Sequence, residues 1–289
     1  MIIDAHAHLW KKQNGIVGGK SVYDIGGGRS DFGGEIRQMM PPYMTDGENS
    51  CQRFLANMDY AGVSGAVITQ EYIDGNQDAY LLECKCDRIK VCTLYEEKAL
   101  GNVECFDGIK ICASRLADKN LSHHLEPFRV ANDKNLFISI DLADGAQQTG
   151  MLQEIIDTFP DLRIAIGHFG MVTRENWTDQ IKLARNKHVF IESGGITWLF
   201  HKEFYPYPSA VKAINEAADI VGFEKLMWGS DYPRTMTAIT YKMSLDFIEK
   251  TNDITDDHKR LLLGENAKNF YGFADLAVPP KIRNMVEDD

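Results

Sequence analysis

Two histidines, His6 and His8, stand two residues apart just after the apolar start Ile2-Ile3. Side chains on a strand repeat every two residues, so both imidazoles would point to the same side. Two imidazoles at a strand end can bind one metal ion, because imidazole is the commonest protein ligand for zinc and related metals. A lone His-x-His can also simply face solvent, so the prediction of a metal site depends on residues further along the chain.

Two more residues of suitable chemistry, His168 and Asp231, follow short apolar runs far downstream. The runs are residues 163–166 and 225–228. If these runs are parallel strands of one sheet, their carboxyl ends meet at one edge. His6, His8, His168 and Asp231 would then gather at a single rim.

Eight apolar runs can supply the strands of such a sheet, with helical patterns between most of them, as at 47–61, 147–159 and 207–221. This alternation is typical of βαβ units, and eight of them in about 230 residues predict a (β/α)₈ TIM barrel. The runner-up is an open doubly wound sheet, which would usually carry a glycine-rich turn where this chain has histidines. We expect one domain over 1–289, with a long loop insertion at about 10–46. The runs are 1–4, 64–69, 90–94, 107–111, 136–142, 163–166, 189–192 and 225–228.

Composition narrows the range of functions. The chain has 289 residues, 44% of them hydrophobic and 25% charged, as in an ordinary globular protein. The net charge of −11 makes nucleic acid an unsuitable partner, and no apolar run approaches the roughly 20 residues that span a bilayer. Charged Asp4 and the two histidines do not fit a signal peptide, so we expect a cytoplasmic enzyme without membrane contact.

Three motifs together resemble the amidohydrolase superfamily, and more closely its amidohydrolase-related branch. They are Ile-Asp-Ala-His-Ala-His-Leu-Trp (3–10), Gly-His-Phe-Gly (167–170) and Trp-Gly-Ser-Asp-Tyr-Pro (228–233), and the similarity runs from Ile2 to about Phe273. That branch contains lactonases of sugar acids and dicarboxylic lactones, and decarboxylases of the aminocarboxymuconate-semialdehyde type. The resemblance implies that His6 and His8 bind a metal, and that Asp231 binds it, handles the proton of the attacking water, or both. His168 would polarise the substrate or move a proton.

The predicted fifth strand departs from this pattern. Many members carry a histidine ligand at its end, whereas this chain has Asp141. Asp141 could replace it as an oxygen ligand, or serve as a helix cap or ion-pair residue. Three protein ligands still suffice for a catalytic zinc ion. We therefore expect one divalent metal ion, zinc before manganese, and leave a metal-free lactonase open.

Lys110 lies on the predicted fourth strand and has three interpretations. It can hold a substrate carboxylate or oxyanion, which is the role we assign. It can instead pair with a neighbouring acid inside the rim. The third interpretation, a carboxylated lysine bridging two metals as in binuclear relatives, is disfavoured because the missing histidine leaves a second metal short of ligands.

Other substrate contacts are expected from the segments around the rim. Arg37, in the 10–46 insertion, could bind a substrate carboxylate or could be an ordinary surface arginine. Arg234, just past Asp231, suits an anionic substrate, and Trp198 suits a sugar ring or a planar acid. The aromatic segment 198–207 could instead form a contact in a homodimer or larger homo-oligomer.

These residues lead to one hypothesis and two alternatives. The hypothesis is a metal-dependent hydrolase that opens a lactone or similar ester of a small polar or carboxylated substrate, with Asp231 and His168 as catalytic residues. The first alternative is a metal-dependent, non-oxidative decarboxylase of an unsaturated or aromatic acid. The second is a barrel that binds a small molecule but has lost turnover.

Overall fold

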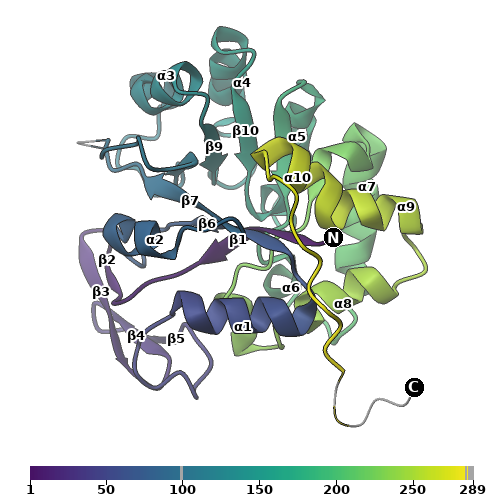
Figure 1. The fold of residues 1–289 in the computed structure, drawn as a ribbon. Coiled ribbons are helices and arrows are strands. Elements are labelled where there is room, and N and C mark those ends of the chain that lie inside the picture. Colours follow the sequence, from purple (N-terminus) through teal and green to yellow (C-terminus); the bar gives the residue numbers. More distant parts are fainter. Residues whose placement is uncertain (98–99, 284, 286–289) are drawn as a thin grey trace.

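The barrel sheet is visible in the computed structural model, which describes residues 1–97, 100–283 and 285 (Figure 1). Eight parallel strands follow one another in the order β1-β6-β7-β8-β9-β10-β11-β12. Each coincides with one of the eight predicted apolar runs to within a few residues, which confirms the (β/α)₈ barrel. The strands are β1 (Ile3–His8), β6 (Gly65–Thr69), β7 (Ile89–Leu94), β8 (Gly108–Ile111), β9 (Phe137–Ile140), β10 (Arg163–Ile166), β11 (Val189–Glu192) and β12 (Leu226–Met227).

Helices surround the strands on the outside (Figure 1). The helical patterns predicted at 47–61, 147–159 and 207–221 are confirmed as α1, α4 and α7. The helices are α1 (Cys51–Ala61), α2 (Asp78–Cys84), α3 (Leu125–Asp133), α4 (Thr149–Thr158), α5 (Trp177–Lys182), α6 (Ile196–Leu199), α7 (Pro208–Val221), α8 (Met243–Lys250), α9 (Asp256–Arg260) and α10 (Asn266–Tyr271), with a π-helical turn at Leu261–Glu265. In the part of the chain that the structure describes, no helix is both long and apolar enough to cross a membrane.

The barrel closes between β1 and the segment that follows β12. Three backbone hydrogen bonds make the seam: Ala5 N to Trp228 O (2.9 Å), Asp231 N to His6 O (2.8 Å) and His8 N to Tyr232 O (2.8 Å). The buried Asp4 carboxylate reinforces it, because Oδ1 accepts from Ser230 N (2.9 Å) and Oδ2 from Ser230 Oγ (2.5 Å). The first and last strands are thereby joined.

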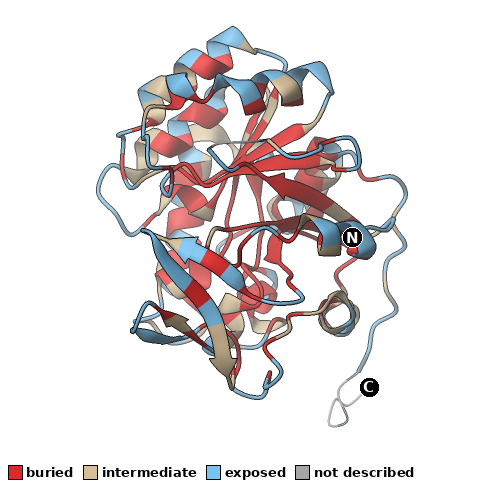
Figure 2. Cartoon of the chain, turned by 90° about the vertical axis from the view of Figure 1, so that its left-hand side faces the viewer, coloured by how far each residue is buried: buried red, intermediate tan, exposed pale blue. Residues whose placement is uncertain are grey.

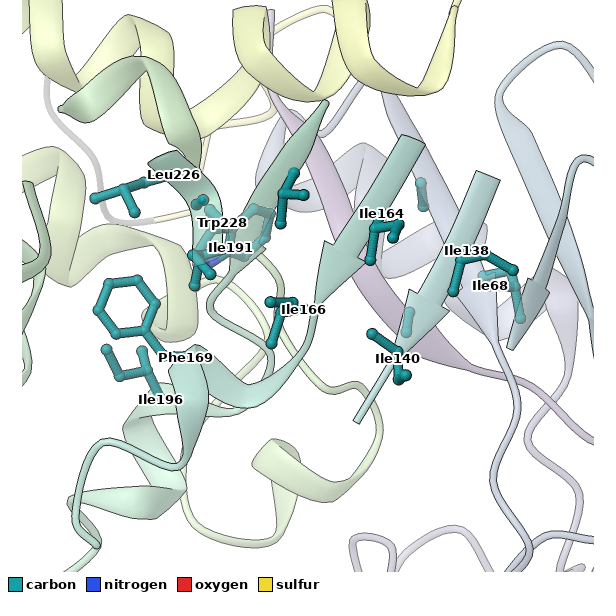
Figure 3. Packing of buried hydrophobic residues seen from close by; sticks show 14 of the residues in the cluster. Ile68, Ile138, Ile140, Ile164, Ile166, Phe169, Ile191, Ile196, Leu226 and Trp228 are labelled. Atoms are coloured by element: carbon teal, nitrogen blue, oxygen red, sulfur yellow. The ribbon is translucent and has the colours of Figure 1, made fainter. Parts of the chain in front are cut away.

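Side chains along each barrel strand alternate between pointing outward and pointing inward, and this alternation separates two apolar layers. Isoleucines such as Ile138, Ile140, Ile164 and Ile166 point toward the helices, where they form the main core (Figure 3). The eight barrel strands are accordingly buried along most of their length (Figure 2). The inward side chains form a second cluster that includes Phe137, Ala165 and Met227 with the α10 residues Phe270 and Tyr271. That cluster fills one end of the barrel interior and leaves the opposite end for polar groups.

An irregularity in β1 sets the direction of the two histidines. Ile3 and Ala5 belong to the interior cluster, whereas Ala7 and Leu9 belong to the layer against the helices. The register between β1 and β6 shifts between Asp4 and Ala7. This bulge changes the phase of the alternation, so His6 and His8 both face inward at the carboxyl end of the strand.

The 10–46 segment is not the loop that we expected. It contains a four-stranded antiparallel sheet in the order β2 (Asn14–Val17), β3 (Lys20–Gly26), β4 (Arg29–Phe32) and β5 (Ile36–Gln38). The prediction was wrong because three to seven residues per strand are too few to show a clear period of two. The glycine pairs Gly18-Gly19 and Gly27-Gly28, each with positive φ, were the available signal, because two-residue hairpin turns require that conformation.

Replacing Asp4 with alanine tests the seam. The change removes the Asp4 acceptor from several buried donors, including Ser230 N, His6 N and Tyr241 Oη. We expect the free energy of unfolding to fall by roughly 3 kcal/mol or more, because each buried donor left unsatisfied costs about 1–3 kcal/mol. Urea denaturation measures it, and Asp161→Ala, at a side chain that is 92% exposed, should change stability by less than about 0.5 kcal/mol. Equal losses in the two variants would contradict a special role for Asp4.

Candidate active site

Three buried ligand atoms converge at the polar end of the barrel. His6 Nε2 and His8 Nε2 lie 3.0 Å apart, and Asp231 Oδ1 lies 3.0 Å from His8 Nε2 and 3.9 Å from His6 Nε2. Ligands around a tetrahedral zinc ion stand about 3.3 Å from one another, given bonds of about 2.0–2.1 Å. Among the described residues none donates a well-aligned hydrogen bond to Asp231 Oδ1, although it is buried. Two imidazoles and an unsatisfied carboxylate oxygen therefore fit a divalent cation.

Glu192, at the end of β11, fixes the orientation of His6. Its Oε1 lies 2.6 Å from His6 Nδ1, and its Oε2 accepts from the backbone N–H of Gly194 at 2.6 Å. Both residues are fully buried. A proton on His6 Nδ1 leaves the lone pair on Nε2, facing His8 and Asp231. Carboxylates in this position set the tautomer and raise the basicity of metal-binding histidines.

Asp231 is held from several sides. Trp198 Nε1 donates to Oδ2 at 2.6 Å, and Arg234 Nη1 lies 3.5 Å from Oδ1. Burial raises the pKa of Asp231, but the neighbouring His8 and Arg234 outweigh it and hold that pKa below its usual range. The backbone of Asp231 has φ +55°, a conformation that residues other than glycine adopt at a cost of about 1–3 kcal/mol. Trp198 can approach because residue 195 is glycine: a Cβ there would lie 1.8 Å from Trp198 Nε1.

His168 packs against His6, with the two ring centres 4.8 Å apart. Its Nδ1 lies 2.8 Å from Gly194 O, and a carbonyl can only accept, so Nδ1 carries a proton. Its Nε2 is 3.6 Å from Asp141 Oδ2. Burial lowers the pKa of His168, but the Asp141 carboxylate outweighs burial and raises that pKa to about 9. His168 is therefore a cation at neutral pH, and its backbone also has positive φ, +52°.

Lys110 lies beneath these groups. Its side chain is fully buried, and Nζ is 2.7 Å from Asp141 Oδ1. Of the three interpretations of Lys110, the ion pair with an acid is the one that this geometry supports. Asp141 likewise forms the ion pair that we considered for it. Asp141 Oδ1 and Oδ2 face Lys110 and His168, and a carboxylate oxygen of Asp141 also lies within 4.8 Å of ligand atoms of His6 and His168, so an oxygen-ligand role stays open.

A cavity of about 580 Å³ lies above this site, within the range typical of pockets for small molecules. Its wall includes Arg37, Trp198 and Arg234, three of the four predicted substrate-binding residues, but not Lys110. The inserted sheet contributes Phe32, Arg37 and Gln38, and Met39 follows just after β5.

Each arginine of the cavity wall already faces a carboxylate. Arg37 Nε is 2.9 Å from Glu35, Arg115 Nε is 3.1 Å from Glu71, and Arg234 Nη2 is 2.8 Å from Asp74. The cavity therefore offers hydrogen-bond donors without a block of uncompensated positive charge.

Two site residues were given no role from the sequence. Glu192 ends a predicted strand, so the rule that strand ends form the rim could have selected it. Asp74 lies five residues beyond β6, in a connection with no periodic pattern, and no sequence signal pointed to it.

The fold and this rim define a (β/α)₈ barrel with a His-x-His pair on the first strand and an aspartate after the last. The amidohydrolase family profile matches residues 3–273, and the chain belongs to that family. No curated protein matches it in sequence.

Solved structures share the fold at low identity. A probable 2-pyrone-4,6-dicarboxylic acid hydrolase of Acinetobacter baumannii, with bound citric acid, has a TM-score of 0.70 and 20% identity over 94% of this chain and 99% of that one. A zinc-bound amidohydrolase of Burkholderia multivorans has a TM-score of 0.68 and 16% identity over 95% and 100%. A 5-carboxyvanillate decarboxylase of Novosphingobium aromaticivorans, with manganese, has a TM-score of 0.54 and 15% identity over 76% and 80%.

Replacing Glu192 with glutamine tests the metal site. The amide keeps the size of the side chain but removes the charge that orients His6, so the zinc dissociation constant should rise about 10–100-fold. Competition with a chromophoric chelator measures it. Glu203→Gln is the matched control, because Glu203 also accepts a backbone N–H, from Ser209, outside this site. Unchanged zinc affinity in Glu192→Gln would rule out its role at the metal.

Proposed function

We propose that this chain is a metal-dependent hydrolase that opens a lactone or similar ester of a small polar or carboxylated molecule. The observation that carries the proposal is that the Asp231 carboxylate and the His168 imidazole both lie close to His6 and both line one cavity. The pKa of Asp231 is held low and the pKa of His168 is raised to about 9, which favours a carboxylate and an imidazolium in the same site. Ester hydrolysis needs a proton acceptor for water and a positive group for the developing oxyanion.

Asp231 is the proposed general base. Because its pKa is held low, Asp231 is ionised throughout the physiological range, as a general base must be before it accepts a proton. As water adds to the carbonyl carbon, its proton passes to the Asp231 carboxylate. The carbon–oxygen bond of the ring then breaks, and the leaving alkoxide takes that proton. The low basicity of Asp231 favours this second transfer.

His168 is the proposed electrophilic partner. With Nδ1 bound to Gly194 O, its Nε2–H is the group that can donate to the carbonyl oxygen of a substrate. The hydrogen bond strengthens as negative charge develops on that oxygen. A divalent ion held by His6, His8 and Asp231 would supply Lewis acidity at the same carbonyl, with zinc proposed before manganese.

The cavity wall suggests the substrate class. Paired arginines still donate hydrogen bonds, whereas a multiply charged anion would have to compete with Glu35, Glu71 and Asp74 for them. A polyhydroxylated lactone, or one with a single carboxylate, suits this balance. Trp198 offers an indole at the wall for a sugar ring or a planar acid.

Decarboxylation of an unsaturated or aromatic acid is the second candidate. The His168 cation that would stabilise an oxyanion can equally hold a substrate carboxylate. The two reactions differ in product, because ring opening releases an acid, whereas decarboxylation releases carbon dioxide. A chain that is stabilised thermally by small polar acids and lactones, yet forms no product from them, would be a binding protein that has lost turnover.

Asp231→Asn tests the role of Asp231 as general base. The assay uses a lactone that the wild-type chain hydrolyses, chosen from a panel of sugar-acid and dicarboxylic lactones. The amide cannot accept the proton of water, so kcat should fall about 10²–10⁴-fold, measured by acid release in a pH-stat, while circular dichroism stays unchanged. Asp219→Asn, on the exposed face of α7, should retain wild-type kcat. Near-normal turnover in Asp231→Asn would refute the base assignment, and carbon dioxide release by the wild type would favour the decarboxylase.

A further inference from the structure

Asp74 is a buried carboxylate beside the metal site with no role so far. It lies in the connection between β6 and α2 and is 2% exposed. Arg234 Nη2 donates to both of its oxygens, at 3.0 Å and 2.8 Å. Its Oδ2 also lies 3.8 Å from His8 Nδ1. One side chain therefore faces two residues of the candidate site at once.

His8 lacks the partner that His6 has. Its Nδ1 is buried and has no hydrogen bond within the described residues, whereas His6 Nδ1 has Glu192. Asp74 Oδ2 is the carboxylate oxygen that faces His8 Nδ1, so it stands to His8 as Glu192 stands to His6. A movement of less than about 1 Å would bring the pair to hydrogen-bond distance.

Arg234 connects the same carboxylate to Asp231. Its Nη1 lies 3.5 Å from Asp231 Oδ1 while Nη2 contacts Asp74. The guanidinium is thus shared between two aspartates. Without Asp74, Arg234 would interact more strongly with Asp231 and draw its Oδ1 away from the two histidines.

The inserted sheet holds Asp74 in place. Gln13 Nε2 points at Asp74 Oδ1 from 3.5 Å, and Ser30 Oγ of β4 donates to Gln13 Oε1 at 2.5 Å. The backbone of Asn14 donates to Asp74 O at 3.1 Å. The contact is close, since a Cβ at Gly15 would lie 2.0 Å from Ile73 O. A continuous set of contacts therefore runs from β4 through Gln13 and Asp74 to Arg234 and Asp231.

We propose that Asp74 is a positioning residue of the metal centre, which orients the imidazole of His8 and shares Arg234 with Asp231. This rests on the proposed metal site, but not on which reaction the enzyme catalyses. Asp74 accepts the Nδ1 proton of His8, so that the Nε2 lone pair faces His6 and Asp231. The inserted sheet, through Gln13, sets where Asp74 stands.

Zinc affinity of Asp74→Asn is the direct test, measured at one fixed pH by chelator competition on the purified full chain. The amide removes the negative charge, so His8 and Arg234 both lose the charge that Asp74 supplies. We expect the zinc dissociation constant to rise about 10–100-fold while circular dichroism is retained. Asp144→Asn is the matched control, because Asp144 lies on the same cavity wall but pairs with Arg174, at 3.2 Å.

The outcomes separate this proposal from the proposed function. Weaker zinc binding in Asp74→Asn alone supports it; unchanged binding, or an equal loss in Asp144→Asn, overturns it. A wild-type chain that binds no zinc overturns both this role and the metal site, whereas failure of Asp231 as a base leaves the zinc result intact. If Asp74→Asn does not fold, Asp74→Glu keeps the charge but moves the carboxylate, and wild-type zinc affinity in that variant overturns the proposal.

Discussion

The seam that closes the barrel is the constraint on which the site depends. His6 and His8 belong to the first strand, and Asp231 follows the last, so the three ligand atoms meet only when those ends are joined. The backbone of Asp231 is itself part of the seam, since its N–H donates to His6 O. The same hydrogen bonds that complete the fold therefore bring the ligands together, and local opening of the seam would separate them.

Burial of many charges at the polar end of the barrel is the second constraint. An isolated buried charge is strongly destabilising, so each one here has a partner. Lys110 neutralises Asp141, which in turn keeps His168 protonated. Because these groups stabilise one another, removing one side chain leaves its neighbour uncompensated, and the site behaves as a unit with a fixed arrangement of charge.

Much of this architecture follows from sequence pattern alone, for a physical reason. Strand ends of a parallel barrel must share one rim, so the positions of His6, His8, His168 and Asp231 along the chain suffice to place them together. Asp74 could not be placed in this way, because its side chain enters from an irregular connection, where backbone course is set by tertiary packing. The strands of the 14–38 sheet were missed for a different reason: with three to seven residues each, they are too short to show a clear period of two. The sequence also does not show that the Lys110 side chain is fully buried and absent from the cavity wall.

Because of the inserted sheet, the reacting groups and much of the cavity wall come from different parts of the fold. Strand ends fix the reacting groups, and their geometry cannot change without disturbing the seam. Phe32, Arg37, Gln38 and Met39 come instead from the inserted sheet or the residue just after β5, so substitutions there can reshape the cavity without moving the reacting groups. The sheet is nevertheless fastened to the centre through Gln13 and Asp74. Changes at the tips of its hairpins should therefore alter which substrate is accepted, whereas changes at its attachment beside Asp74 should alter the metal site itself.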